Sequence, residues 1–158
     1  MGLREVKKEL NKMDKSEMIK LISEMYSKIP SAKEFLDIFS GVKIETLIEK
    51  YKKEIERYVY PSGREMLLRE SEARKIIRNV RKMKIVELNV ELELYYVECC
   101  LEIIQDFGYF NESYYIAVEK MFDSAINGIS QIGENEKYEE RINNIYNIAS
   151  EYGIEFYY

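Results

Sequence analysis

The residues best placed to do chemistry lie in a basic segment, residues 64–84, which carries eight cations and three anions. On a helical wheel five of the cations occupy the face opposite an apolar one. Cations at that spacing could bind the phosphates of RNA, DNA or another anionic partner. A solvated face, or one paired with acidic neighbours, is the commoner reason for such a run. This candidate anion-binding stripe, the basic stripe, consists of Arg74, Lys75, Arg78, Arg81 and Lys82.

A second candidate is a pair of polar residues within an apolar arc. Asn89 and Glu93 are four residues apart, so a helix places them on one side, among apolar neighbours. An ionised carboxylate in such surroundings needs a partner, and we nominate Arg69 from the preceding segment. The pair is favoured as a structural ion pair. The functional alternative is the polar floor of a ligand pocket, or a carboxylate with a raised pKa.

The absence of histidine excludes several kinds of site. It removes Ser-His-Asp and Cys-His triads, His-ligated zinc and imidazole acid–base catalysis. An acidic stripe could hold a metal, but four-helix di-iron sites need Glu-x-x-His pairs. We therefore interpret that stripe as a solvent-facing strip or a partner for the basic segment, and expect no metal and no cofactor. Its residues are Glu87, Glu91, Glu98 and Glu102.

The remaining motifs indicate structure rather than chemistry. Cys99 and Cys100 are adjacent, without C-x-x-C spacing, and are expected to be small core residues. Of the fourteen tyrosines, ten follow residue 94. Core packing or docking of the chain end is their favoured use, and an interface is the alternative. The candidate interface aromatics are Tyr114, Tyr115, Phe156, Tyr157 and Tyr158.

The elements that must position these residues are all helical. Helical periodicity is interrupted mainly at prolines and glycines, where turns and caps belong. Capping boxes begin helices at Asp14-x-x-Glu17 and Ser31-x-x-Glu34, with Pro30 closing the first. The fold class is therefore all-α: one domain, residues 1–158, of about eight helices in an irregular antiparallel bundle or a short stack of helix pairs. The predicted helices cover residues 2–11, 14–29, 31–39, 44–60, 66–84, 85–107, 111–127 and 136–152.

One segment has a competing interpretation. Residues 86–94 alternate apolar and polar side chains, the period of a half-buried strand. A helix over residues 85–107 gathers the acidic stripe into a sector of about 60° and leaves the rest almost entirely apolar. A helix explains the whole segment, so we predict that it is the central, mostly buried helix.

Length, composition and charge indicate the domain size and the expected location of the protein. A chain of 158 residues with 46% apolar residues can form one folded domain. The charged amino-terminal residues leave no room for a signal peptide, and no apolar run approaches the length of a membrane span. With its lone adjacent cysteine pair, we expect a cytoplasmic protein. The net charge of −5 conceals a split: +2 over residues 1–63, +5 over 64–84 and −12 over 85–158.

Several segments resemble a known family of small bacterial proteins. They are Gly2–Leu10, Lys15–Ile22, Glu49–Lys53, Tyr95–Glu98 and the stretch from Phe107-Gly108 onward. The family is domain of unknown function 6155, and the resemblance covers essentially the whole chain. It implies an all-helical cytosolic domain. It implies no activity, cofactor or catalytic residue.

The function expected from the sequence is a non-catalytic interaction or adaptor module that binds another protein or a second copy of itself. One alternative is a nucleic-acid-associated protein that uses the basic segment 64–84. A second alternative is a small-molecule-binding protein or an enzyme with a pocket near Glu93. We expect no membrane partner.

Overall fold

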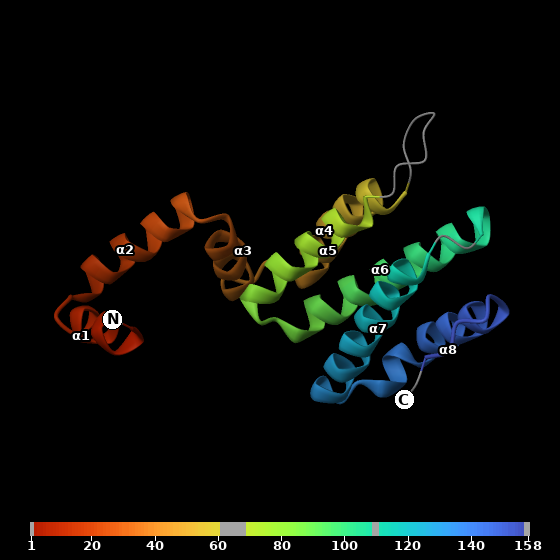
Figure 1. Cartoon of the computed structure of the whole chain (residues 1–158). Helices are drawn as coiled ribbons and strands as arrows, with labels where there is room; N and C mark the ends of the chain where they lie inside the picture. Colours follow the sequence, from red (N-terminus) through yellow and green to blue (C-terminus); the bar gives the residue numbers. More distant parts are fainter. Residues whose placement is uncertain (1, 61–68, 109–110, 157–158) are drawn as a thin grey trace. The chain divides into compact units, whose positions relative to one another are not determined.

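The computed structural model describes residues 2–60, 69–108 and 111–156, and within these ranges it contains eight α-helices, one short 3-10 helix and no strand (Figure 1). This confirms the all-α class. The chain divides into two compact units, Met1–Lys43 and Ile44–Tyr158. The single domain over residues 1–158 stays a prediction. None of the described helices is both long and apolar enough to cross a lipid bilayer.

The first unit holds α1 (Leu3–Leu10), α2 (Lys15–Lys28) and α3 (Pro30–Phe39). The capping box predicted at Asp14 is confirmed, because its carboxylate accepts the backbone N–H of Glu17 at 2.8 Å. The second predicted capping box is wrong. α2 ends just before Pro30, as predicted, but Pro30 rather than a residue after Ser31 is the first residue of α3, since its fixed φ and missing N–H suit a first helical position. Neither α1 nor α2 contains a buried residue.

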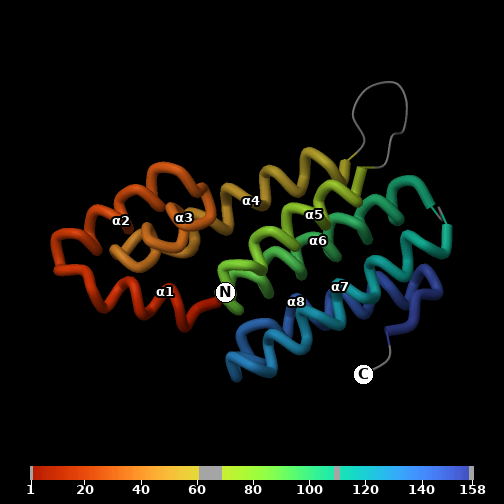
Figure 2. The backbone as a smooth tube through the Cα atoms, turned by 60° about the vertical axis from the view of Figure 1, so that its left-hand side comes forward, coloured from red at the N-terminus to blue at the C-terminus, as the bar shows by residue number. Residues whose placement is uncertain are grey.

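The described residues of the second unit form five α-helices and one 3-10 helix. Each α-helix runs antiparallel to the one before it (Figure 2). α6 is its centre and packs against α4, α5, α7 and α8. The elements are α4 (Ile44–Val59), α5 (Glu70–Val80), the 3-10 helix η1 (Arg81–Met83), α6 (Val86–Phe107), α7 (Glu112–Ile132) and α8 (Asn135–Glu151).

The alternating segment forms the start of α6, which confirms the helical interpretation. Twelve of the 22 residues of α6 are buried, including Leu88, Val90 and Leu92. A helix surrounded by four others can bury apolar side chains on most of its circumference. Local alternation in its sequence therefore carries no information about strands.

Two helix ends differ from prediction. α7 was expected to stop at residue 127, before Gly128, but it continues to Ile132 and ends at Gly133, whose φ is 69°. Gly128 serves packing instead: a Cβ there would lie 2.5 Å from Cγ2 of Val90, so glycine lets α6 and α7 approach closely. The basic segment gives α5 and then η1, and Lys84 ends η1 in the left-handed region at φ 56°. Residues 66–68 of the predicted helix lie outside the described residues.

Candidate anion-binding groove

A groove of about 450 Å³ lies between the α5–η1 segment and α7, within the second unit. Its two walls differ in character. The first carries three arginines, and the second carries one lysine, two serines and three apolar residues. The lining residues are Arg74, Arg78, Arg81, Ser113, Ile116, Ala117, Lys120, Met121 and Ser124.

The helical period of α5 determines which part of the basic stripe reaches this groove. Ala73, Ile77 and Val80 are buried. Each of the three arginines comes one residue after one of these buried residues. Arg74, Arg78 and Arg81 therefore lie about 100° around the helix from them, at the edge of the buried face. Lys75 and Lys82 lie a further 100° or so around, away from the groove. The structure therefore brings three members of the basic stripe together and leaves two outside.

Arg81 connects the groove to the core. Its Nε donates to Oε1 of Glu93 at 2.8 Å, and its Nη2 donates to Oγ of Ser124 at 3.2 Å. The Ser124 hydroxyl donates to the same Glu93 oxygen at 2.9 Å. Glu93 is only 2% exposed, so the buried carboxylate has two donors from the two walls of the groove.

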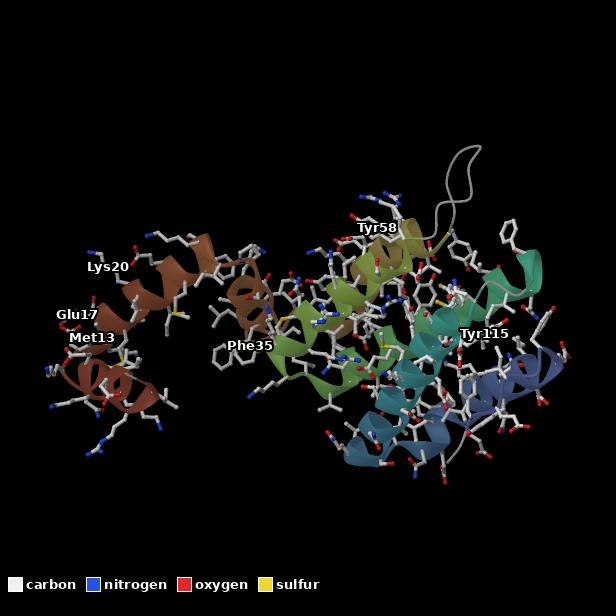
Figure 3. All side chains as sticks on the ribbon, in the orientation of Figure 1. Met13, Glu17, Lys20, Phe35, Tyr58 and Tyr115 are labelled. Carbon is white, nitrogen blue, oxygen red and sulfur yellow. The ribbon has the colours of Figure 1, made fainter. Side chains whose placement is uncertain are left out.

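The nomination of Arg69 as the partner of Glu93 is wrong. Because α5 and α6 run in opposite directions (Figure 2), the first residues of α5 lie near the last turns of α6, far along the helix from Glu93. The end of α5 and η1 lie near its first turns. The guanidinium of Arg69 instead stacks over the ring of Tyr58 on α4, 5.2 Å from its centroid; Figure 3 labels Tyr58.

Burial raises the pKa of Glu93 above its ordinary value, and the charge of Arg81 and the hydrogen bonds from Arg81 and Ser124 offset part of that rise. Asn89 does not share this network. Its Oδ1 is buried without a hydrogen-bond partner among the described residues. Neither Asn89 nor Glu93 lines the groove, so Glu93 acts on it only through Arg81 and Ser124.

Arg74 is anchored at the other end of the same wall. Its Nη1 donates to the hydroxyl of Tyr96 on α6 at 2.9 Å and lies 3.8 Å from a carboxylate oxygen of Glu70. Arg74 and Arg81 are thus both held by groups beneath or beside them, which fixes the two ends of the arginine row.

Between these ends the groove carries unneutralised charge. Arg78 and Lys120 form no hydrogen bond and no ion pair with any residue that the structure describes. None of the described residues that line the groove carries a carboxylate. A site with two unpaired cations, flanked by two anchored arginines, produces a positive potential that attracts an anion.

The other members of the basic stripe have different surroundings. Lys75 forms an ion pair with Glu72 at 2.9 Å and lines a separate pocket between α4 and α5. Lys82 is exposed on η1 and does not line the groove.

Three carboxylates of the acidic stripe pair with α8, which corrects the expectation that they face solvent or the basic segment, whereas Glu102 is exposed. Arg141 donates from Nε to Glu98 at 2.8 Å and from Nη1 to Glu91 at 2.7 Å, and Lys137 pairs with Glu87 at 3.1 Å. Glu102 accepts a hydrogen bond from Tyr60. Carboxylates a turn or two apart on α6 thus match cations one turn apart on α8.

The candidate interface aromatics fall into three groups. Tyr114 is buried, and its hydroxyl donates to the backbone oxygen of Cys100 at 3.1 Å, with the half-buried Tyr115 edge-on to its ring. Phe156 packs against Phe122 with ring centroids 4.6 Å apart. These three rings serve packing within the unit. Tyr157 and Tyr158 lie outside the described residues.

Cys99 and Cys100 are buried free thiols, as expected of small core residues. Burial raises the pKa of each to about 12. Thiols that stay protonated at neutral pH are poor nucleophiles and poor metal ligands.

The sequence interpretation missed the α7 wall. Its lining positions, 113, 116, 117, 120, 121 and 124, follow the i, i+3, i+4, i+7 spacing of one helix face. One indication was available: Lys120, Lys137 and Arg141 are the only cations after residue 85. Two of them neutralise α6, and the third lies in the groove.

Comparison with known proteins identifies the chain only at family level. No curated protein and no solved structure gives a significant match. The model of a family described as a family of unknown function (DUF6155) matches residues 1–154. The chain belongs to the DUF6155 family.

Proposed function

We propose that the protein is a non-catalytic binding module that recognises a negatively charged partner in the groove between α5 and α7. The observation that carries this proposal is the pair Arg78 and Lys120, which face one groove from two helices without a partner among the described residues. Surface cations at random positions are usually paired or solvated singly. Two that share a recess with anchored arginines favour binding of an anion.

Binding is favoured over catalysis by the chemistry of the neighbouring groups. The sequence has no histidine to act as a base near neutral pH. Of the described residues that line the groove, Ser124 has its hydroxyl bonded to a carboxylate, and Arg81 donates to the same oxygen of Glu93. Because Oε1 of Glu93 already accepts hydrogen bonds from both Arg81 and Ser124, this arrangement is better suited to holding Arg81 in place than to activating Ser124.

Titration of the protein with anionic probes tests the proposal. The probes are inorganic phosphate, poly-glutamate and an oligothymidylate, each titrated by calorimetry at about 50 mM and about 300 mM salt. The groove variant is Arg78→Glu with Lys120→Glu. The matched control is Lys75→Glu with Lys82→Glu, which makes the same change in net charge outside the groove.

We expect at least one probe to bind at low salt, with affinity reduced at least about tenfold in the groove variant and much less in the control. If no probe binds, the groove does not recognise anions. If both variants lose affinity equally, binding follows the overall charge of the protein and the proposal is wrong.

A further inference from the structure

We infer that the partner which fills this groove is an acidic amphipathic helix of another protein, an inference that rests on the proposed function. A helix can present a row of carboxylates and a row of apolar side chains side by side, and the groove offers a matching wall for each. The length of the groove, the chemistry of its two walls and the lack of aromatic rings in its described lining all favour this partner.

The length of the groove fits a few turns of a partner helix. Arg74, Arg78 and Arg81 span seven residues, which is about 10 Å along a helix, and the α7 wall from Ser113 to Ser124 spans about 16 Å. α5 and α7 run in the same direction (Figure 2), and the Arg81–Ser124 hydrogen bond fixes their register at one end. The i, i+4, i+7 spacing of the arginines is also the spacing of residues along one face of a partner helix.

Because one wall is cationic and the other is partly apolar, a matching partner must present both acidic and apolar side chains. The α5 wall is cationic. The α7 wall contributes Ile116, Ala117 and Met121, and Ile116 is 41% exposed beside the charges. Ala117 is partly exposed, and Met121 forms the floor, since it is only 5% exposed and its sulfur accepts a hydrogen bond from Nη2 of Arg81 at 3.4 Å. A partner with only charge would leave the α7 wall exposed to water.

Nucleic acid fits this groove less well. Single strands bind where bases can stack on aromatic rings, and none of the described residues that line the groove is aromatic. Duplex readers insert a protruding helix into the DNA, whereas α5 forms one wall of a recess. The apolar α7 wall has no counterpart in a phosphate backbone. These features favour the acidic helix.

The probe is a synthetic alanine-based helical peptide of about 18 residues. Glutamates occupy positions i, i+4 and i+7, and leucines occupy the position after each, which places the two rows about 100° apart. One control peptide has glutamine in place of glutamate, and a second has the same composition in scrambled order. An oligothymidylate of equal charge is the nucleic-acid control. Binding is followed by fluorescence anisotropy with the full chain.

Substitutions on each wall distinguish the outcomes. Arg78→Glu with Lys120→Glu should weaken peptide binding at least about tenfold. Ile116→Ser should weaken peptide binding severalfold while leaving oligothymidylate and poly-glutamate binding unchanged, because it removes only apolar contact. Circular dichroism of each variant confirms that it remains folded, as expected for side chains at an open groove.

We expect the ordered acidic peptide to bind more tightly than both control peptides. Equal binding of the scrambled peptide, or tighter binding of the oligothymidylate, overturns the acidic helix but leaves anion recognition in place. Failure of every anionic probe overturns the proposed function as well. The two failures are therefore distinguishable.

Discussion

Cations on the two sides of α6 differ in whether they have a carboxylate partner. Toward α8, Arg141 and Lys137 meet the carboxylates of Glu91, Glu98 and Glu87. Toward the α5–α7 groove, Arg81 meets Glu93, while Arg78 and Lys120 meet no carboxylate of the described residues. The same residue types thus neutralise an acidic helix on one side and form an uncompensated positive recess on the other.

The difference shows that the function of a cation depends on its pairing rather than on its position in a charged run. A paired cation stabilises the fold, and removing it leaves a carboxylate without a partner. An unpaired cation contributes little to stability and remains available to a ligand. Substitutions on the two sides of α6 should therefore separate stability from binding.

The largest effect is expected for Arg81→Met. Removing this arginine leaves Glu93 buried with only Ser124 as a donor, so the free energy of unfolding should fall by about 3 kcal/mol. Chemical denaturation measures the change. Arg81→Lys, which retains the charge, should recover part of the loss. A loss under about 0.5 kcal/mol for Arg81→Met would show that Glu93 does not depend on Arg81.

The effect of Arg81→Met should also depend on pH. Burial already raises the pKa of Glu93, and loss of Arg81 raises it further. A carboxyl whose pKa is higher in the folded than in the unfolded state stabilises the fold below its unfolded pKa, and this contribution is lost as pH rises through the folded pKa. Destabilisation should therefore be larger at about pH 8 than at about pH 5. The opposite trend would contradict this assignment.

The next largest effect is expected for Gly128→Ala, which tests how closely α7, the apolar wall of the groove, must approach α6. The new Cβ would lie 2.5 Å from Cγ2 of Val90, so overpacking should cost about 2 kcal/mol. The double variant with Val90→Ala relieves the clash and should cost less than the sum of the two single changes. Thermal and chemical denaturation of all three variants measure the coupling; additive effects would rule out the clash.

On the α8 side, Arg141→Met should reduce the free energy of unfolding by about 1 to 2 kcal/mol, because Glu91 and Glu98 lose their shared donor. Both carboxylates retain partial access to water, so the loss should be smaller than for Arg81→Met. Anion binding in the groove should not change. A loss of binding equal to that of the groove variant would mean that the two sides of α6 are not independent.

The smallest effect on stability is expected for Arg78→Gln with Lys120→Gln. Neither cation has a partner among the described residues, so denaturation should shift by no more than about 0.5 kcal/mol in either direction. Binding of an anionic probe should nevertheless weaken at least about tenfold. A large loss of stability would show that these cations are structural.

Local patterns predicted most of the fold. The Asp14 capping box, the helix ending before Pro61 and the buried central helix are properties of short segments, because caps, turns and the 3.6-residue period act over a few residues. The predicted helix ends were wrong at residues that can serve two structural roles. Pro30 both blocks a preceding helix and starts the next, and Gly128 looks like a stop but permits close packing with Val90.

The candidate site was predicted only in part. Arg74, Arg78 and Arg81 were identified because they share one wall on one helix. Lys75 and Lys82 were grouped with them because a wheel shows a polar face but not what packs beside it. Ser113, Ile116 and Lys120 were missed, since nothing near them in sequence indicates that α7 faces α5.

Residue types and local spacing were enough to predict the helices, the absence of histidine chemistry and the uneven distribution of charge. They were not enough to predict which charges neutralise one another, because that depends on how the helices pack. Glu93 pairs with Arg81 rather than Arg69, and three of the four carboxylates of the acidic stripe pair with α8 rather than with the basic segment. The physical reason is that ion pairing falls off over a few ångströms, and those distances arise between helices far apart in the chain.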